Sequence, residues 1–74
     1  MCEVKIYLNK KDEKTKIIDG ISEYQLNLGD KKLIAYPTFG RAKEFKFKNI
    51  DWIRWGESDD SLIIQGELES IVEN

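Results

Sequence analysis

Apolar and polar residues alternate with a period of two along much of this chain, and that pattern limits the folds open to it. In the N-terminal segment Val4, Ile6 and Leu8 occupy every second position, with Lys5 and Tyr7 between them. This spacing is typical of a strand with one buried face, because successive side chains of a strand point to opposite sides. The segment is therefore predicted to be a β-strand.

Turn-forming residues divide the chain after this first strand. Residues 10–14 are polar and predict a loop. Residues 15–18 predict a second short strand, because the pair Asp19 and Gly20 that follows is a turn signal. A short strand, a turn and a further strand are therefore expected here.

A β-hairpin is the clearest local prediction. Residues 24–28 and 32–36 both alternate, and Gly29 and Asp30 stand between them. A glycine at that point supports a tight reversal of the chain. Pro37 has no N–H to donate to a ladder, so the second strand of the hairpin is expected to end there.

The aromatic segment that follows supplies candidate core residues. After a loop or single helical turn over residues 38–43, Phe45 and Phe47 share one face of a predicted strand and are expected in the core. Trp55 shares a face with Ile53 and is also expected at the core or its edge. Its replacement by alanine would then cost about 3 to 5 kcal/mol.

The C-terminal segment carries two overlapping patterns. Leu62 and Ile64 suit a strand, whereas Ile64, Leu68, Ile71 and Val72 fall at the i, i+4, i+7 and i+8 positions of a helix stripe. We predict a short helix over residues 65–73 that packs on the sheet. The expected fold class is therefore α+β, a small antiparallel β-sheet with a C-terminal helix.

Length and composition predict one domain over residues 1–74. A chain of 74 residues with 41% hydrophobic and 35% charged residues has the composition of a globular domain with one core. Its single cysteine, Cys2, cannot form an internal disulfide, and apolar runs such as residues 62–64 are far shorter than the roughly 20 residues of a membrane span. We expect a cytoplasmic protein without a membrane segment.

Charge is distributed unevenly along the chain. Residues 1–37 carry seven lysines and six acids (+1), residues 38–55 carry five bases and two acids (+3), and residues 56–74 carry six acids and no base (−6), which sum to −2. The acidic end is either a solvated surface that keeps a small domain soluble or an electrostatic handle for a partner with a basic surface. Composition leaves both interpretations open.

The residues that most catalysis requires are scarce. The chain has no histidine, which removes the commonest general base and Ser-His or Cys-His nucleophilic catalysis. Glu57, Asp59 and Asp60 place three carboxylates within four positions, but the spacing lacks the glycine and the distal glutamate of a calcium loop. A solvated turn is the preferred interpretation. We expect no enzyme activity, no cofactor and no metal.

Cations and aromatic rings interleave between residues 41 and 54, as they do on some surfaces that bind single-stranded nucleic acid. The predicted strand places Phe45 and Phe47 opposite Lys46 and Lys48, which favours core rings and a solvated lysine face. Direct nucleic-acid binding is therefore disfavoured for a chain with an acidic balance.

Several short motifs resemble the small bacterial domain-of-unknown-function family 2442. The motifs that carry the resemblance are residues 28–37, Phe39 to Arg41, residues 53–55, residues 59–62 and residues 66–68. The resemblance implies a compact α+β domain without recognised catalytic residues, often encoded beside toxin-antitoxin-like partners. It implies no active site.

We therefore expect a protein-binding module that acts as a regulatory or antitoxin-like partner of another protein. The alternative is a small phage-type inhibitor of a bacterial defence complex of the CRISPR kind, in which an acidic surface imitates phosphates. A homodimer also remains open, because short sheets leave strand edges that can pair. The candidate partner-binding residues are Phe39, Arg41, Trp52, Arg54, Glu57, Asp59 and Asp60.

Overall fold

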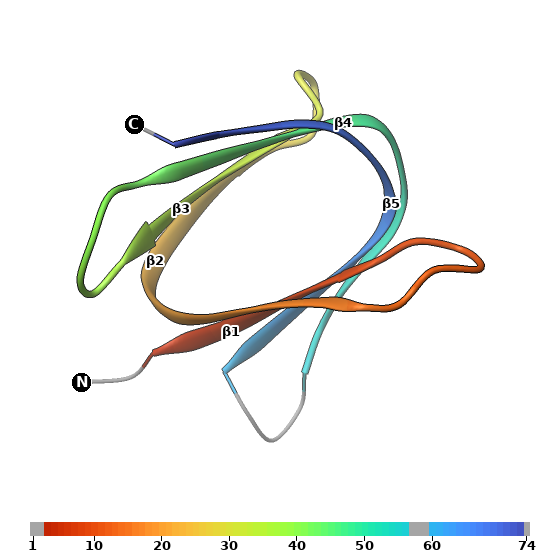
Figure 1. Ribbon diagram of the computed structural model, residues 1–74. Helices are drawn as coiled ribbons and strands as arrows, with labels where there is room; N and C mark the ends of the chain where they lie inside the picture. The colour runs from red at the N-terminus through yellow and green to blue at the C-terminus, as the bar shows by residue number, and fades with distance from the viewer. Residues whose placement is uncertain (1–2, 57–59, 74) are drawn as a thin grey trace.

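The computed structural model describes residues 3–56 and 60–73, and it forms a closed five-stranded β-barrel (Figure 1). Each strand pairs with the next in antiparallel orientation, and β1 closes the barrel by pairing with β5 in parallel. A parallel closure follows from the odd number of strands, because directions alternate and the first and last strands then point the same way. The strands are β1 (Val4–Asn9), β2 (Lys16–Asn27), β3 (Lys32–Pro37), β4 (Lys43–Trp55) and β5 (Ser61–Glu73).

The three long strands bend and contribute to two different sheets. One, which we call the β3 sheet, contains β3, residues 21–27 of β2, residues 43–46 of β4 and the end of β5. The other, the β1 sheet, contains β1 between the first parts of β2 and β5, with the end of β4 at its edge. Figure 1 shows β4 and β5 curving together from one sheet to the other.

The core lies between these two sheets and is entirely apolar among the described residues. Its largest fully buried side chains come from four of the strands, which is why the barrel has one continuous interior. The buried residues are Ile6, Leu8, Ile21, Leu33, Ala35, Phe45, Phe47, Leu62 and Ile64. The predictions that Phe45 and Phe47 belong to the core are confirmed.

Gly66 permits the shared bend of β4 and β5. It lies opposite Ile50, and a Cβ atom at this position would meet the backbone oxygen of Asn49 and lie 3.0 Å from the Ile50 Cα. Register shifts in the β4–β5 pair flank this point, and such bulges add local bend and twist to a strand pair. Only glycine leaves room for this close backbone approach.

The predicted C-terminal helix is wrong, and with it the α+β class. Residues 61–73 form β5, and the described part of the chain consists of strands and their connections without a helix. Three of the four residues that imitate a helix stripe, Ile64, Leu68 and Ile71, are inward residues of a bulged strand, whereas Val72 faces outward opposite Glu44. Leu62, Ile64 and Leu68 pair with inward residues of β4, and a register shift then moves the inward position to Ile71, opposite Phe45.

The predicted short strand and turn near residue 20 are also wrong. β2 continues through Asp19 and Gly20 to Asn27, and Gly20 has a φ of 69° within a bend of the strand. Glycine adopts this conformation without steric cost, so the signal for a turn marks a strand bend instead. The first strand, the hairpin at Gly29 and the end of its second strand at Pro37 are confirmed.

Candidate functional site

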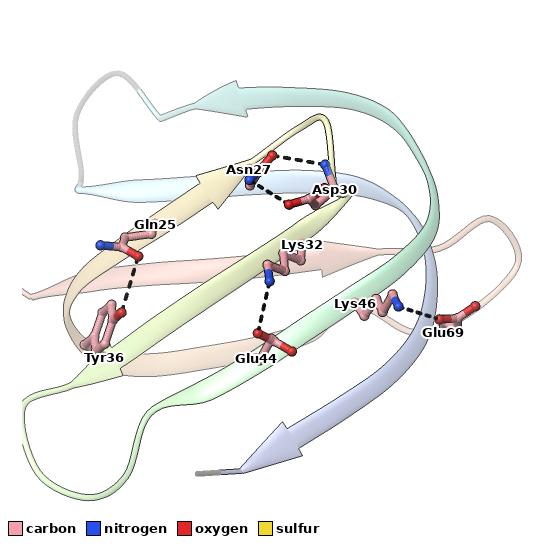
Figure 2. A network of polar contacts seen from close by, with 8 residues as sticks. All are labelled: Gln25, Asn27, Asp30, Lys32, Tyr36, Glu44, Lys46 and Glu69. Carbon is pink, nitrogen blue, oxygen red and sulfur yellow. Dashed lines mark hydrogen bonds and ion pairs between the residues drawn. The ribbon is translucent and has the colours of Figure 1, made fainter.

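The outer faces of the two sheets differ in chemistry. The β3 sheet presents a polar network whose members bind one another (Figure 2). The Lys32 amine lies 3.6 Å from the Glu44 carboxylate, and the Lys46 amine lies 3.8 Å from that of Glu69. The Tyr36 hydroxyl donates to the Gln25 side chain over 3.4 Å. This face is mostly polar, and its apolar residues Ile34 and Val72 lie on opposite sides of Glu44.

The β1 sheet instead carries a row of apolar side chains on its outer face. Tyr7 of β1 lies directly opposite Ile17 of β2 on one side and Ile63 of β5 on the other. Ile63 in turn lies opposite Arg54 of β4, so the row crosses all four strands. Residues paired in this way share a face. These four alternate with inward residues such as Ile6, Ile18 and Ile64, which places them outside.

Trp52 lies two positions before Arg54 on β4, opposite Gln65, and adds an aromatic ring beside the row. Its side chain is 41% exposed, and the Arg54 guanidinium carbon lies 5.4 Å from the centre of its ring. This is a cation–π distance, and it holds the two side chains together on the surface of β4. At the other end of the row Ile17 is 55% exposed. We call Ile17, Tyr7, Ile63, Trp52 and Arg54 the row face.

Polar pairs border the row face on both sides. The Lys5 amine lies 3.6 Å from the Asp19 carboxylate on one side. On the other side, the Thr15 hydroxyl donates to the Asn9 side-chain oxygen over 2.7 Å. An apolar centre with a polar border is the usual anatomy of a protein interface. The row face therefore has the composition of a docking surface.

The structure separates Phe39 and Arg41 from the row face. Phe39 and Arg41 belong to the loop between β3 and β4, where they border a cavity of about 320 Å³. Thr38 fixes this loop, because its N–H donates to the Gly20 oxygen and its hydroxyl to the Glu3 carboxylate. Phe39 is 90% exposed. Of the candidate residues, Trp52 and Arg54 are the pair that the fold brings together.

The predicted acidic cluster falls mostly outside the described part of the chain. Glu57 and Asp59 are not described, and neither is Cys2. Asp60 is exposed and precedes β5, and its backbone oxygen accepts a hydrogen bond of 2.9 Å from the Lys5 N–H.

Lysines from the β1–β2 loop and from β4 lie beside two acids of β5. The Lys10 amine lies 3.5 Å from the Glu67 carboxylate and 3.4 Å from that of Glu13, and Lys46 neighbours Glu69. The hydrogen bond with Glu13 is the main cause that raises the pKa of Lys10 above its usual value. Glu67 and Glu69, two acids of this acidic run, therefore have lysine neighbours on the folded surface.

Trp55, which is predicted at the core or its edge, does not lie in the core. It is 59% exposed, and its indole N–H donates to the Tyr24 hydroxyl over 2.7 Å. It does follow Ile53 on the inward face of β4, but the strand continues past the end of the core. Trp52 is exposed as well, at 41%.

The sequence analysis missed Ile17, Tyr7 and Ile63. The sequence does contain a signal for Ile17 and Ile63. A strand with one solvent-exposed face is expected to alternate, so two adjacent apolar residues indicate that one of them faces solvent. Ile17 stands beside Ile18 and Ile63 stands between Leu62 and Ile64. One of each set had to face outward, and their cross-strand alignment required the register of the barrel.

Other classes of site find no support in the described residues. No group of three or more His, Cys, Asp or Glu side chains in residues 3–56 and 60–73 lies close enough together to hold a metal ion. That part of the chain also contains no helix long and apolar enough to cross a membrane. No family model, curated protein or solved structure matches the chain significantly. The resemblance to family 2442 stays a prediction.

Proposed function

We propose that this barrel is a non-catalytic protein-binding module that regulates another protein by docking on it through the row face. The observation that supports the proposal is the difference between the two outer faces. On the β3 sheet the charged Glu44 separates Ile34 from Val72, whereas the β1 sheet aligns Ile17, Tyr7 and Ile63 without a polar residue between them and exposes Trp52 beside them. Exposed apolar patches with a polar border are typical of interaction sites.

Trp52 and Arg54 are the expected anchors of this surface. Tryptophan and arginine are enriched among residues whose truncation costs most binding energy. Arg54 already lies against the Trp52 ring, so little side-chain freedom is lost when a partner covers both. The partner is expected to supply an apolar patch and a carboxylate for Arg54. The acids of β5 have lysine neighbours, so they support a basic partner surface less well.

The experiment compares capture by variants of matched exposure. Ile17→Lys places a charge in the row face, at a residue that is 55% exposed. The control Val72→Lys places the same charge at a residue that is 48% exposed and lies opposite Glu44 on the β3 sheet. Each tagged protein is incubated with lysate of its source cells, and captured proteins are quantified by mass spectrometry. A protein retained by wild type and Val72→Lys but lost with Ile17→Lys and Trp52→Ala supports the proposal.

Two results would contradict it. The first is a captured protein that all four chains retain equally, since the row face would then not be the contact. The second is a concentration-dependent dimer in sedimentation experiments that Ile17→Lys alone abolishes. That result would assign the row face to a second copy of the chain rather than to a different protein.

A further inference from the structure

One edge of the β1 sheet has no strand beside it. β4 pairs with β3 only through residues 43–46, and the Phe47 N–H then reaches the Lys31 oxygen over 2.8 Å. The Lys31 amine closes this end by donating to the Lys48 oxygen over 3.3 Å. From residue 49 to residue 55 the described strands pair with β4 on its β5 side alone. β4 is therefore an edge strand over this length.

The register identifies the backbone groups that this edge offers. The Gly56 N–H donates to the Ser61 oxygen over 3.1 Å, so Gly56 points toward β5. In an antiparallel pair, alternate residues direct both backbone groups to the partner strand. Trp52 and Arg54 then also point toward β5, opposite Gln65 and Ile63. Ile53 and Trp55 direct their N–H and C=O groups away from β5, toward the free edge.

An apolar groove follows the same edge. Its volume is about 370 Å³, and both inward and outward residues of β4 contribute to it. It therefore runs along the edge of the strand rather than over one face. The lining residues are Leu28, Lys31, Ile50, Asp51, Trp52 and Ile53. Trp52 belongs to the groove and to the row face, so the two surfaces are continuous.

Cations lie at both ends of this edge. Lys31 and Lys48 stand at its beginning, and Arg54 stands near its end on the Trp52 ring. The single acid between them, Asp51, already accepts a hydrogen bond of 2.9 Å from the Asn49 amide. Residues 48 and 54 are about 20 Å apart in an extended strand. A complementary segment has apolar residues at its centre and carboxylates at its ends.

We infer that an extended segment of the partner protein adds to β4 as a sixth strand, with an apolar centre and acidic ends. This inference rests on the proposed function, since the segment belongs to the protein that covers the row face. Backbone pairing with Ile53 and Trp55 supplies the ladder, and the groove receives apolar side chains of the segment. The register shift between Ile50 and Trp52 limits regular pairing to the end of β4, so the ladder is short.

The test uses a synthetic heptapeptide of the inferred chemistry, acetyl-Glu-Glu-Val-Ser-Ile-Glu-Glu-amide, titrated into the full isotope-labelled chain. Amide hydrogen exchange is measured by NMR with and without saturating peptide. We expect exchange at Ile53 and Trp55 to slow at least about tenfold, since these N–H groups gain an acceptor. Exchange at Trp52 and Arg54, which already bond to β5, should change little. A peptide with lysines in place of its glutamates should bind more weakly.

Two controls define the result. N-methyl groups on alternate residues of the heptapeptide remove the N–H donors along one of its two edges. The methylation can start at an odd or an even residue, and only the pattern that blocks the edge facing β4 should abolish the protection of Ile53 and Trp55 from exchange. Protection at residues 67–73 instead, chemical shift changes at Trp52 without protection of Ile53, or no saturable binding would each overturn strand addition. None of these outcomes decides the row face, which is tested by the Ile17→Lys and Val72→Lys comparison. Conversely, Ile17→Lys and Val72→Lys could capture a protein equally while the peptide slows amide exchange at Ile53. That result would support strand addition to β4 and contradict docking through the row face.

Discussion

The Trp55 indole N–H donates a 2.7 Å hydrogen bond to the Tyr24 hydroxyl and so connects β4 with β2, two strands that share no backbone ladder. The two strands belong here to different sheets, and both have a free edge at this corner of the barrel. A side-chain bond therefore does what backbone pairing does elsewhere around the barrel. It holds the β1 and β3 sheets together at the end of the core.

A double-mutant cycle measures this connection. Tyr24→Phe and Trp55→Phe each remove one partner and keep a ring, and the free energy of unfolding is measured by urea denaturation. We expect a coupling of about 0.5 to 1.5 kcal/mol, toward the low end because Trp55 is largely exposed. Tyr36→Phe is the control, since its hydroxyl bond to Gln25 is 3.4 Å long and lies within one sheet. Additive losses in the cycle would show that the bond contributes nothing.

Core and edge rings should differ clearly in their contribution to stability. Phe45 is 1% exposed and lies among the buried residues of four strands, so Phe45→Ala is expected to cost about 3 to 5 kcal/mol. Trp55→Ala removes a ring that is mostly solvated and one hydrogen bond, and should cost less than about 2 kcal/mol. Thermal unfolding of both variants tests this order. Equal losses would place Trp55 in the core after all.

The sequence predicted the strands whose alternation is uninterrupted and failed where bulges shift it. The inward positions of β5 run Leu62, Ile64, Gly66 and Leu68 and then move to Ile71. Gly66 occupies an inward position but is not apolar enough to be recognised as one. The register shift near residue 69 then moves the inward positions from even to odd residue numbers. The visible remainder has the spacing of a helix. Neither the close contact at Gly66 nor the bulge follows from one strand considered alone.

The contact of Gly66 with β4 predicts a large effect for a small substitution. In Gly66→Ala the new methyl group would meet backbone atoms of Asn49 and Ile50, which cannot rotate away. We expect a loss of about 1 to 3 kcal/mol, the usual cost of overpacking. Gly29→Ala is the matched control, because its Cβ would meet only the Asn27 side chain at 3.4 Å. Equal melting temperatures of the two variants would show that the bend tolerates a side chain.

Two residues of the candidate site, Trp52 and Arg54, could be predicted from the sequence, but the rest of the row face could not. Trp52 and Arg54 stand two positions apart on a predicted strand, which indicates a shared outward face. Phe39 and Arg41 share the same composition signal, but their loop lies away from that face. Ile17, Tyr7 and Ile63 come from three strands, and the parallel pairing of β1 with β5 aligns two of them. That closure depends on the whole barrel.

The last prediction concerns Lys10 and its pH dependence. Its pKa is raised in the folded chain, mainly by the hydrogen bond with Glu13 and then by the charges of Glu13 and Glu67. A raised lysine pKa means that the folded state holds the proton more tightly, so the contribution of Lys10 to stability is complete below pH 10.5 and is lost as pH rises through the folded pKa. Melting temperatures of wild type and Lys10→Gln should therefore differ slightly at pH 8 and converge above pH 10.5. Lys11→Gln, in the same exposed loop and without an ion pair among the described residues, is the control. Curves for Lys10→Gln that stay parallel to wild type across this range would show that the pairs with Glu13 and Glu67 do not stabilise the fold.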